Sequence, residues 1–274
     1  MWCTDGTQGG TTMIIQYTNG FTSESYPLGY HNSVYFPAND PTHGEGLWAA
    51  DQNGVPAFIK NINWPHSFFI FNDKLNFFDR NGIFMMSDGT SLGTHPWQDN
   101  TNATFQPISS FQIFQNKVYF FDMNHSFCSF DGVIVTKIKK FPAPPVPTSM
   151  IAGCGDKIFF CIKNSVSSTF DLWWSNGTPD GTTFYKSLYN PSPNTYGFLG
   201  YLIEGDKLGF LTRNDTNTGS DFWVIDANNN YSIKKAFPNS FQAFFNLKAV
   251  SINNTIFAFC NYNNSGFRLY KLTL

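Results

Sequence analysis

Short apolar and aromatic segments alternate with turn residues along the whole chain. In 172–185, the apolar run Leu172–Trp174 leads into Ser-Asn-Gly-Thr-Pro-Asp-Gly-Thr and then into the aromatic run Thr183–Tyr185. Gly, Asn, Asp and Pro suit tight turns because they adopt positive φ, bond their own backbone or fix φ. A strand, a tight turn and a second strand in this order predict a β-hairpin.

The same strand-turn-strand pattern recurs with a period in the forties. In the strand that precedes each turn, one position recurs with this period, and we call the residue there the marker residue. The marker residues along the chain are Trp2, Trp48, Met85, Cys128, Trp173, Trp223 and Tyr270. A second pattern, in which a turn residue leads directly into an apolar and aromatic strand, alternates with the first. It begins at residues 32, 73, 116, 156, 206 and 254. A repeat of this length and strand content predicts the blades of a β-propeller rather than a helical solenoid.

The two patterns together predict an all-β chain that forms a single β-propeller domain, residues 1–274. Each blade is expected to be a four-stranded antiparallel sheet. The predicted blades cover 24–62, 63–101, 104–142, 148–189, 195–240 and, with only three strands, 241–274. Pro-rich stretches such as Phe141–Pro147 are expected to connect blades, since Pro cannot serve a central strand.

The segment 241–274 lacks a fourth strand, and an open strand edge invites aggregation. Residues 1–16 contain a strand around Thr11–Gln16 that can pair with this last blade and close the ring. This count gives six blades. Seven blades remain the alternative, because Trp2 marks one more strand than six blades require.

The most complete turns carry the motif Ser/Thr-Asp/Asn-Gly-Thr followed by Gly-Thr. They lie at Thr4–Thr11, Ser87–Thr94 and Ser175–Thr182. This pattern resembles the ELWxxDGT repeat family, whose repeats are read as four-stranded propeller blades, although no copy here has Glu before the apolar pair. The resemblance covers the whole chain. It implies the propeller fold and does not identify a ligand.

The turn also resembles the Asp-box of sialidases. Its Asp5, Asp88 and Asn176 are interpreted as structural, because such side chains bond backbone N–H groups and hold the turn while Gly supplies positive φ. The marker residues Trp2, Trp48, Trp173 and Trp223 are expected to fill the space between adjacent blades.

Composition excludes several classes of function. Aromatic residues make up 18% of the chain and charged residues only 13%, and the formal net charge is −2. Nucleic-acid binding needs a basic surface, so this class is excluded. No run of about eighteen apolar residues occurs, so no membrane span is expected. The five cysteines, an odd number, give no disulfide framework and are expected as small buried apolar residues on strands.

Seven Asn-x-Ser/Thr sequons favour an extracellular or cell-surface location. They are Asn102, Asn124, Asn176, Asn214, Asn230, Asn253 and Asn263. A cytoplasmic location is the alternative, because an Asn-rich chain forms sequons by chance and this one opens inside a repeat with no signal peptide ahead of it.

Candidate binding residues are aromatic or cationic. Trp64, Trp97 and Trp174 lie outside the marker register and are the candidates for exposed rings that stack on sugars. Arg80, Arg213 and Arg268 lie near turns between the second and third strands of a blade. Three arginines can clamp a carboxylate, as in a sialidase, but such an enzyme also needs a Tyr–Glu pair and a separate acid.

One loop could hold calcium. Asp215, Asn217 and Asp221 place oxygen ligands at alternate positions, although the closing Glu of an EF-hand is missing. No other metal or cofactor is expected, because the histidines lack ligand spacing and no nucleotide-binding loop occurs.

These observations predict a non-catalytic recognition module that binds a glycan or a glycoprotein through propeller loops. The first alternative is a structural, self-assembling scaffold, which would be a homo-oligomer. The second is a sialidase-like glycoside hydrolase.

Overall fold

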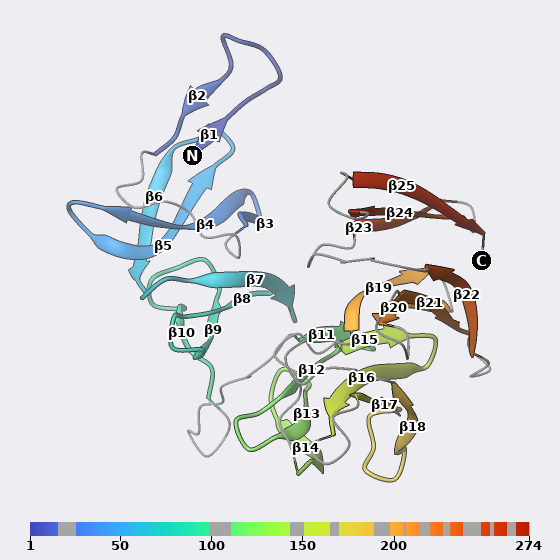
Figure 1. Ribbon diagram of the computed structural model, residues 1–274. Helices are drawn as coiled ribbons and strands as arrows, with labels where there is room; N and C mark the ends of the chain where they lie inside the picture. Colours follow the sequence, from blue (N-terminus) through green and yellow to red (C-terminus); the bar gives the residue numbers. More distant parts are fainter. Residues whose placement is uncertain are drawn as a thin grey trace. The chain divides into compact units, whose positions relative to one another are not determined.

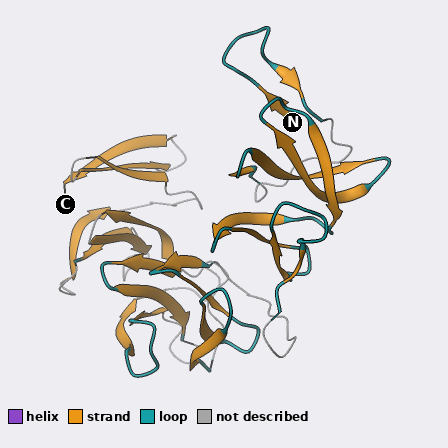
Figure 2. Cartoon of the chain, turned by 180° about the vertical axis from the view of Figure 1, so that it is seen from behind, coloured by secondary structure: helices purple, strands orange, loops and turns teal. Residues whose placement is uncertain are grey.

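The computed structural model describes residues 1–15, 26–98, 111–142, 151–164, 170–188, 198–204, 207–213, 220–226, 231–237, 248–252, 255–261 and 267–273. In these residues every regular element is a β-strand, and the strands form antiparallel meanders (Figure 1; Figure 2). The contacts group the chain into two compact units, Met1–Pro107 with Gly132–Ile134, and Ile108–Asp131 with Val135–Leu274. The prediction of one domain over 1–274 stays a prediction.

The first unit begins with a hairpin and continues with two four-stranded sheets. The hairpin pairs β1 (Trp2–Cys3) with β2 (Thr12–Met13). The first sheet contains β3 (Leu28–Tyr30), β4 (Ser33–Asp40), β5 (Gly44–Asp51) and β6 (Pro56–Asn61). The second contains β7 (His66–Phe71), β8 (Lys74–Phe78), β9 (Phe84–Ser87) and β10 (His95–Pro96).

The second unit contains three four-stranded sheets and one three-stranded sheet in its described residues. The third sheet has β11 (Gln112–Phe114), β12 (Lys117–Phe121), β13 (Ser126–Phe130) and β14 (Val135–Lys140). The fourth has β15 (Ile151–Cys154), β16 (Lys157–Lys163), β17 (Phe170–Ser175) and β18 (Thr182–Leu188). The fifth has β19 (Phe198–Glu204), β20 (Lys207–Arg213), β21 (Ser220–Ile225) and β22 (Tyr231–Phe237). The last has β23 (Lys248–Ile252), β24 (Thr255–Asn261) and β25 (Phe267–Thr273).

Each of the six sheets from β3 to β25 falls inside one predicted blade, which confirms the repeat boundaries. The core follows the second repeat pattern. Its final aromatic residue is almost fully buried in five successive sheets, at Phe36, Phe77, Phe120, Phe160 and Phe210. Side chains alternate between the two faces of a strand, so the fixed spacing from the turn residue sends this ring to the same face each time.

The predicted closure is not observed among the described strands. Thr12 and Met13 pair with Cys3 and Trp2, and the sheet β23–β25 has three strands. The sequence reasoning treated Thr11–Gln16 as a donor to a distant sheet. Pairing across one short turn closes a much smaller loop, and its entropic cost is lower.

The third and fourth strands of four sheets share a β-bulge. The register shifts between Leu47 and Trp48, and between Phe222 and Trp223. It also shifts immediately before Cys128 and Trp173. A bulge leaves one residue unpaired and increases the local twist. In these four sheets the marker residue of the repeat directly follows the bulge.

Two predictions about buried residues are wrong at the N-terminal hairpin. Trp2 was expected to pack between blades but is 64% exposed. Cys3 is exposed as well, whereas Cys128, Cys154 and Cys161 are buried and reduced, as expected for apolar strand residues. The hairpin has only two strands, so its side chains lack the neighbours that cover the same positions elsewhere.

Candidate functional site

The turns Thr4–Thr11, Ser87–Thr94 and Ser175–Thr182, which we call the DGT turns, are held by hydrogen bonds from their own side chains. At the β9–β10 turn, the Ser87 and Thr94 hydroxyls lie 2.7 Å apart, and the Asp88 carboxylate accepts the Thr90 N–H at 2.9 Å. In the β17–β18 turn the same bonds join Ser175 to Thr182 at 2.7 Å. The Thr90 N–H and hydroxyl lower the pKa of Asp88 from its usual value. This geometry supports the structural interpretation of Asp88 and its equivalents.

Each of these two turns also docks against the preceding sheet. A Cβ added at Gly177 would lie 2.7 Å from the Tyr119 hydroxyl of β12, and one at Gly89 would overlap the Tyr35 hydroxyl of β4. Burial raises the pKa of both tyrosines. Only glycine leaves room for the tyrosine, so the turn residue and the strand residue of the neighbouring sheet fit as a pair.

A lysine on the fourth strand reinforces this docking. It stands opposite the last residue before the bulge, in the pairs Leu47–Lys60, Phe127–Lys139 and Leu172–Lys186. Lys60 Nζ donates to Thr94 O at 2.6 Å, and Lys139 Nζ donates to Thr182 O at 3.1 Å. Lys186 Nζ lies 5.3 Å from the ring centroid of Trp223 on the next sheet. The DGT turns at Ser87–Thr94 and Ser175–Thr182 and the lysines beside the bulges thus join adjacent sheets.

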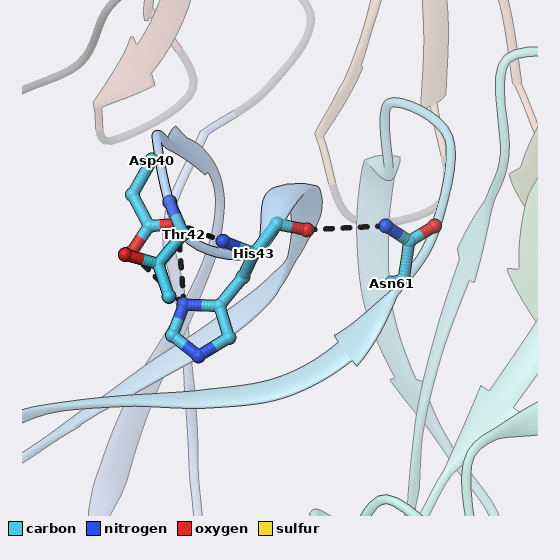
Figure 3. A network of polar contacts seen from close by, with 4 residues as sticks. All are labelled: Asp40, Thr42, His43 and Asn61. Carbon is cyan, nitrogen blue, oxygen red and sulfur yellow. Dashed lines mark hydrogen bonds and ion pairs between the residues drawn. The ribbon is translucent and has the colours of Figure 1, made fainter.

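The candidate site lies on the other turns, those between the second and third strands and those that link sheets. In the first sheet, Asp40 anchors the β4–β5 turn by accepting the N–H groups of Thr42 and His43 (Figure 3). Its carboxylate also faces Nδ1 of His43 at 2.9 Å, and this bond lowers the pKa of Asp40. Among the described residues none bonds Nε2 of His43, whose side chain is 40% exposed.

The His43 ring rests on an aromatic base. It stacks on Phe58 at a centroid distance of 4.4 Å and meets Trp48 edge-on at 5.5 Å. Asp40 and this aromatic stack contact the His43 ring from two sides and so fix its orientation. Beneath it, Nε1 of Trp48 is buried without a hydrogen-bond partner in the described part of the chain.

The connection between the first two sheets joins this turn to the next one. Asn61 Nδ2 donates to the His43 carbonyl at 3.2 Å (Figure 3), and the Arg80 N–H donates to the Asn63 carbonyl at 2.8 Å. The segments Asp40–His43, Asn61–Trp64 and Asp79–Asn81 therefore form one continuous edge, which we call the loop ridge.

Asp79 gives the ridge its second anchor. Its carboxylate accepts the N–H groups of Asn81 at 2.9 Å and Ile83 at 2.8 Å, and the side chain is buried. His66 Nε2 lies 3.2 Å from the Asp79 carbonyl. The anchors face the backbone, so His43, Asn61 and Arg80 remain exposed on the ridge.

The ridge contains two of the predicted binding residues. Arg80 is exposed, and Trp64 is half-buried with a positive φ of 49°. The Arg80–Asn63 backbone bond brings their segments together. Trp97, in contrast, is only 3% exposed and packs near Phe84, so its prediction as an exposed stacking residue is wrong. Trp174 is half-buried, with Lys157 Nζ 4.9 Å from its ring centroid.

The remaining predicted site residues are described in part. Arg213 ends β20 and pairs with Ser220, Arg268 pairs with Cys260, and Asp221 pairs with Thr212; their side chains are outside the described part. Asp215 and Asn217 also lie outside it, as do the sequons Asn102, Asn214, Asn230, Asn253 and Asn263. Asn124 and Asn176 are exposed turn residues.

Sequence reasoning missed the acidic anchors. Asp79 and Asp122 share the pattern Asp-x-Asn, and each accepts the N–H groups two and four residues later. With Asp40, they recur at the same turn of three successive sheets. This spacing was the available signal, but aspartate is common in turns of every kind, so the spacing alone does not distinguish an anchor.

No group of three or more His, Cys, Asp or Glu side chains that could hold a metal occurs in the described residues. The described residues also contain no helix long and apolar enough to cross a membrane.

No family model matches this sequence, and no curated protein matches it either. The structure is similar to BBS1N in its complex with ARL6DN, with a TM-score of 0.54, 13% identity, and coverage of 93% of this chain and 79% of that one. It is also similar to the β-propeller domain of the Trilobed protease from Pyrococcus furiosus, with a TM-score of 0.50, 12% identity, and coverage of 91% and 81%.

The computationally designed protein Ika8 is similar as well, with a TM-score of 0.52 and 8% identity over 92% of this chain and 72% of that one. Identities this low carry information about fold alone. The repeated four-stranded meanders and these similarities together show that the chain has a β-propeller fold.

Proposed function

We propose that this chain is a non-catalytic recognition scaffold that binds a glycan or a glycoprotein through the loop ridge. The proposal rests on one observation: within the loop ridge, some side chains hold the backbone and others are left exposed. The carboxylates of Asp40 and Asp79 hold the backbone, while His43, Asn61 and Arg80 are left exposed beside Trp64.

The chemistry of these groups suits a sugar. Amides and imidazole bond to hydroxyl groups, an indole face can stack on a pyranose ring, and Arg80 can pair with an acidic substituent. Hydrogen bonds join the three segments, which would reduce the ordering required on binding. An extracellular or cell-surface location agrees with this ligand class, and the exposed sequons Asn124 and Asn176 are compatible with it.

The absence of catalysis is part of the proposal. Glycoside hydrolysis uses a protonated carboxylic acid with a raised pKa opposite a second carboxylate. The carboxylate of Asp40 has instead a lowered pKa, because the His43 side chain and the turn N–H groups stabilise its charged form. It therefore acts as an anchor rather than as a proton donor at neutral pH.

A glycan array tests the proposal directly. We expect the full chain to bind a subset of glycans, and Trp64→Ala and Arg80→Ala to reduce that binding at least tenfold, equivalent to about 1.4 kcal/mol. Lys140→Ala, at an exposed position on β14 outside the ridge, is the matched control and should bind as the wild type does.

The same samples distinguish binding from catalysis. Fluorogenic glycosides, sialosides included, should show no turnover above buffer. Turnover that Arg80→Ala, Arg213→Ala or Arg268→Ala abolishes would overturn the non-catalytic assignment. An array without any glycan bound above background would overturn the ligand class.

A further inference from the structure

A serine with an unusual backbone conformation lies near the start of the second sheet. Ser67 belongs to β7 and has a φ of 54°. Among the described residues it is the only one other than glycine that combines a positive φ with a place inside a strand. Side chains with a Cβ rarely adopt this conformation, and it persists only where the surrounding structure enforces it. Residues held in this way cluster at functional sites.

A β-bulge accompanies this conformation. The register shifts between His66 and Phe69, so that Ser67 and Phe68 stand opposite one residue of β8. The first strands of four other sheets, β3, β11, β15 and β23, pair with their second strands without such a shift. The repeat therefore does not require a bulge at this position. Bulges change the direction of side chains and are frequent next to active sites.

The Ser67 hydroxyl lies beside the His66 ring. Ser67 Oγ is 3.0 Å from Nδ1 of His66, and Nε2 of the same ring is 3.2 Å from the Asp79 carbonyl oxygen. A carbonyl oxygen only accepts hydrogen bonds, so Nε2 carries the hydrogen of the neutral ring and Nδ1 has the free lone pair. The Ser67 hydroxyl is therefore the donor to Nδ1.

Asp79 holds the His66 ring in this orientation. Its carbonyl also accepts the Gly82 N–H at 2.9 Å, and its carboxylate accepts the N–H groups of Asn81 and Ile83. The carbonyl that orients His66 is thus fixed by the β8–β9 turn. A hydroxyl group, a base within hydrogen-bond distance of it and a third group that orients the base together form the arrangement of an activated serine.

We propose that Ser67 is a nucleophile with His66 as its general base, and that it accepts the acyl group of an activated ester. Ser67 Oγ attacks the carbonyl carbon, and the bond from that carbon to the leaving oxygen breaks. Nδ1 of His66 takes the Ser67 proton and passes it to the leaving group. The product is an ester on Ser67, and no oxidant or reductant is consumed. Both side chains are half-buried and so remain partly accessible to a small reagent.

This reaction is separate from the proposed glycan binding. The Ser67–His66 pair contacts the loop ridge through Asp79, but it does not belong to the exposed groups that the ridge presents. The transfer places one group on each chain and cleaves no glycosidic bond. Failure of either proposal therefore leaves the other one standing.

A fluorophosphonate–biotin probe tests the nucleophile in the full chain. Its phosphorus bonds to Ser67 Oγ, and fluoride leaves with the proton that His66 has taken. We expect one adduct on each native chain, located at Ser67 by peptide mass spectrometry, and none in Ser67→Ala. Ser91, exposed on a DGT turn, is the matched control, because a reagent limited by access alone would label it first. Ser91→Ala should react as the wild type does.

Chemical rescue tests the base. We expect His66→Ala to react about a hundredfold more slowly at Ser67, with an unchanged circular dichroism spectrum. Added imidazole should restore about tenfold or more of this loss, because a free base can replace a missing proton acceptor but not a missing structural contact. A wild type without an adduct at Ser67, equal labelling of Ser91, a His66→Ala variant that reacts at the wild-type rate, or a loss that imidazole does not restore would each overturn the proposal.

Discussion

At the residue scale, the glycine of each DGT turn is required by its backbone conformation and, in two of the turns, also by packing against the neighbouring sheet. Gly6, Gly89 and Gly177 have φ of 92°, 95° and 87°, a region that side chains with a Cβ rarely adopt. At Gly89 and Gly177 a tyrosine of the preceding sheet also occupies the space of the missing Cβ. The same residue type is therefore required for one reason in the hairpin and for two reasons in the docked turns.

This difference leads to a prediction for Gly177→Val. We expect a loss of unfolding free energy of about 2–3 kcal/mol, from backbone strain together with displacement of Tyr119. Gly6→Val is the control, because it carries the strain without the overlap and should cost about 1 kcal/mol. Urea denaturation measures both. Equal losses in the two variants would contradict the docking of Gly177 on Tyr119.

The carboxylate of Asp88 makes stability depend on pH. Hydrogen bonds from Thr90 lower its pKa, so the folded state binds a proton less readily than the unfolded state. Its contribution is complete above the unfolded pKa of about 4 and is lost as the pH falls through the folded pKa. We expect Asp88→Asn to reduce the drop in Tm between about pH 5 and pH 3.

The chain supplies the reverse experiment. Asn176 accepts the Thr178 N–H at 3.1 Å and the Thr178 hydroxyl at 2.8 Å, as Asp88 does with Thr90. Asn176→Asp should therefore steepen the same acid limb while leaving Tm at neutral pH little changed. Parallel acid limbs in the wild type and both variants would refute the assignment.

At the scale of elements, the bulge and its lysine determine how sheets join. The bulge before the marker residue twists the fourth strand and places Lys60, Lys139 and Lys186 in one register position. From there the ammonium groups reach the next DGT turn or the next marker tryptophan. Lysine suits this position because its long stem spans the gap while its charge stays near the surface.

Removing one of these lysine contacts should weaken the packing between the two sheets that it joins. Lys139→Met loses the bond to Thr182 O and the approach to Trp173, and we expect a loss of about 1–2 kcal/mol of unfolding free energy. Lys140→Met, one residue further at an exposed position, should change stability by less than about 0.5 kcal/mol. Chemical denaturation of the pair provides the measurement, and indistinguishable midpoints would argue against the joint.

At the scale of the whole molecule, the reactivity of each cysteine thiol depends on whether its strand is buried or exposed. Burial raises the pKa of Cys128 and of Cys161 to about 12, so neither thiol ionises appreciably near neutral pH. Cys154 is buried as well, whereas Cys3 lies exposed on the hairpin.

We therefore expect Ellman's reagent at pH 8 to label Cys3 rapidly in the native protein. Cys128, Cys154 and Cys161 should react only after unfolding. Cys3→Ser should remove the rapid labelling at position 3 and serves as the control, with labelled sites located by peptide mass spectrometry. Rapid native labelling of Cys128 or Cys161 would show that the buried packing described for β13 and β16 is incorrect.

The sequence by itself determined the strands, the sheet boundaries and the turns of this protein. These features depend on residues that are close together in the chain. Alternation of apolar and polar residues favours strands, and Gly, Asn and Asp in a fixed order favour turns. The structural role of Asp88 followed from that local pattern.

Only the tertiary structure decided which residues meet across elements. The meeting of the Trp64 and Arg80 segments on one ridge, the burial of Trp97 and the exposure of Trp2 all depend on contacts between separate segments, or on their absence. A sequence period records that a residue recurs in a repeat, but not whether a neighbour covers it. That depends on the packing of complete sheets, because a single sheet buries only the face against which another element packs.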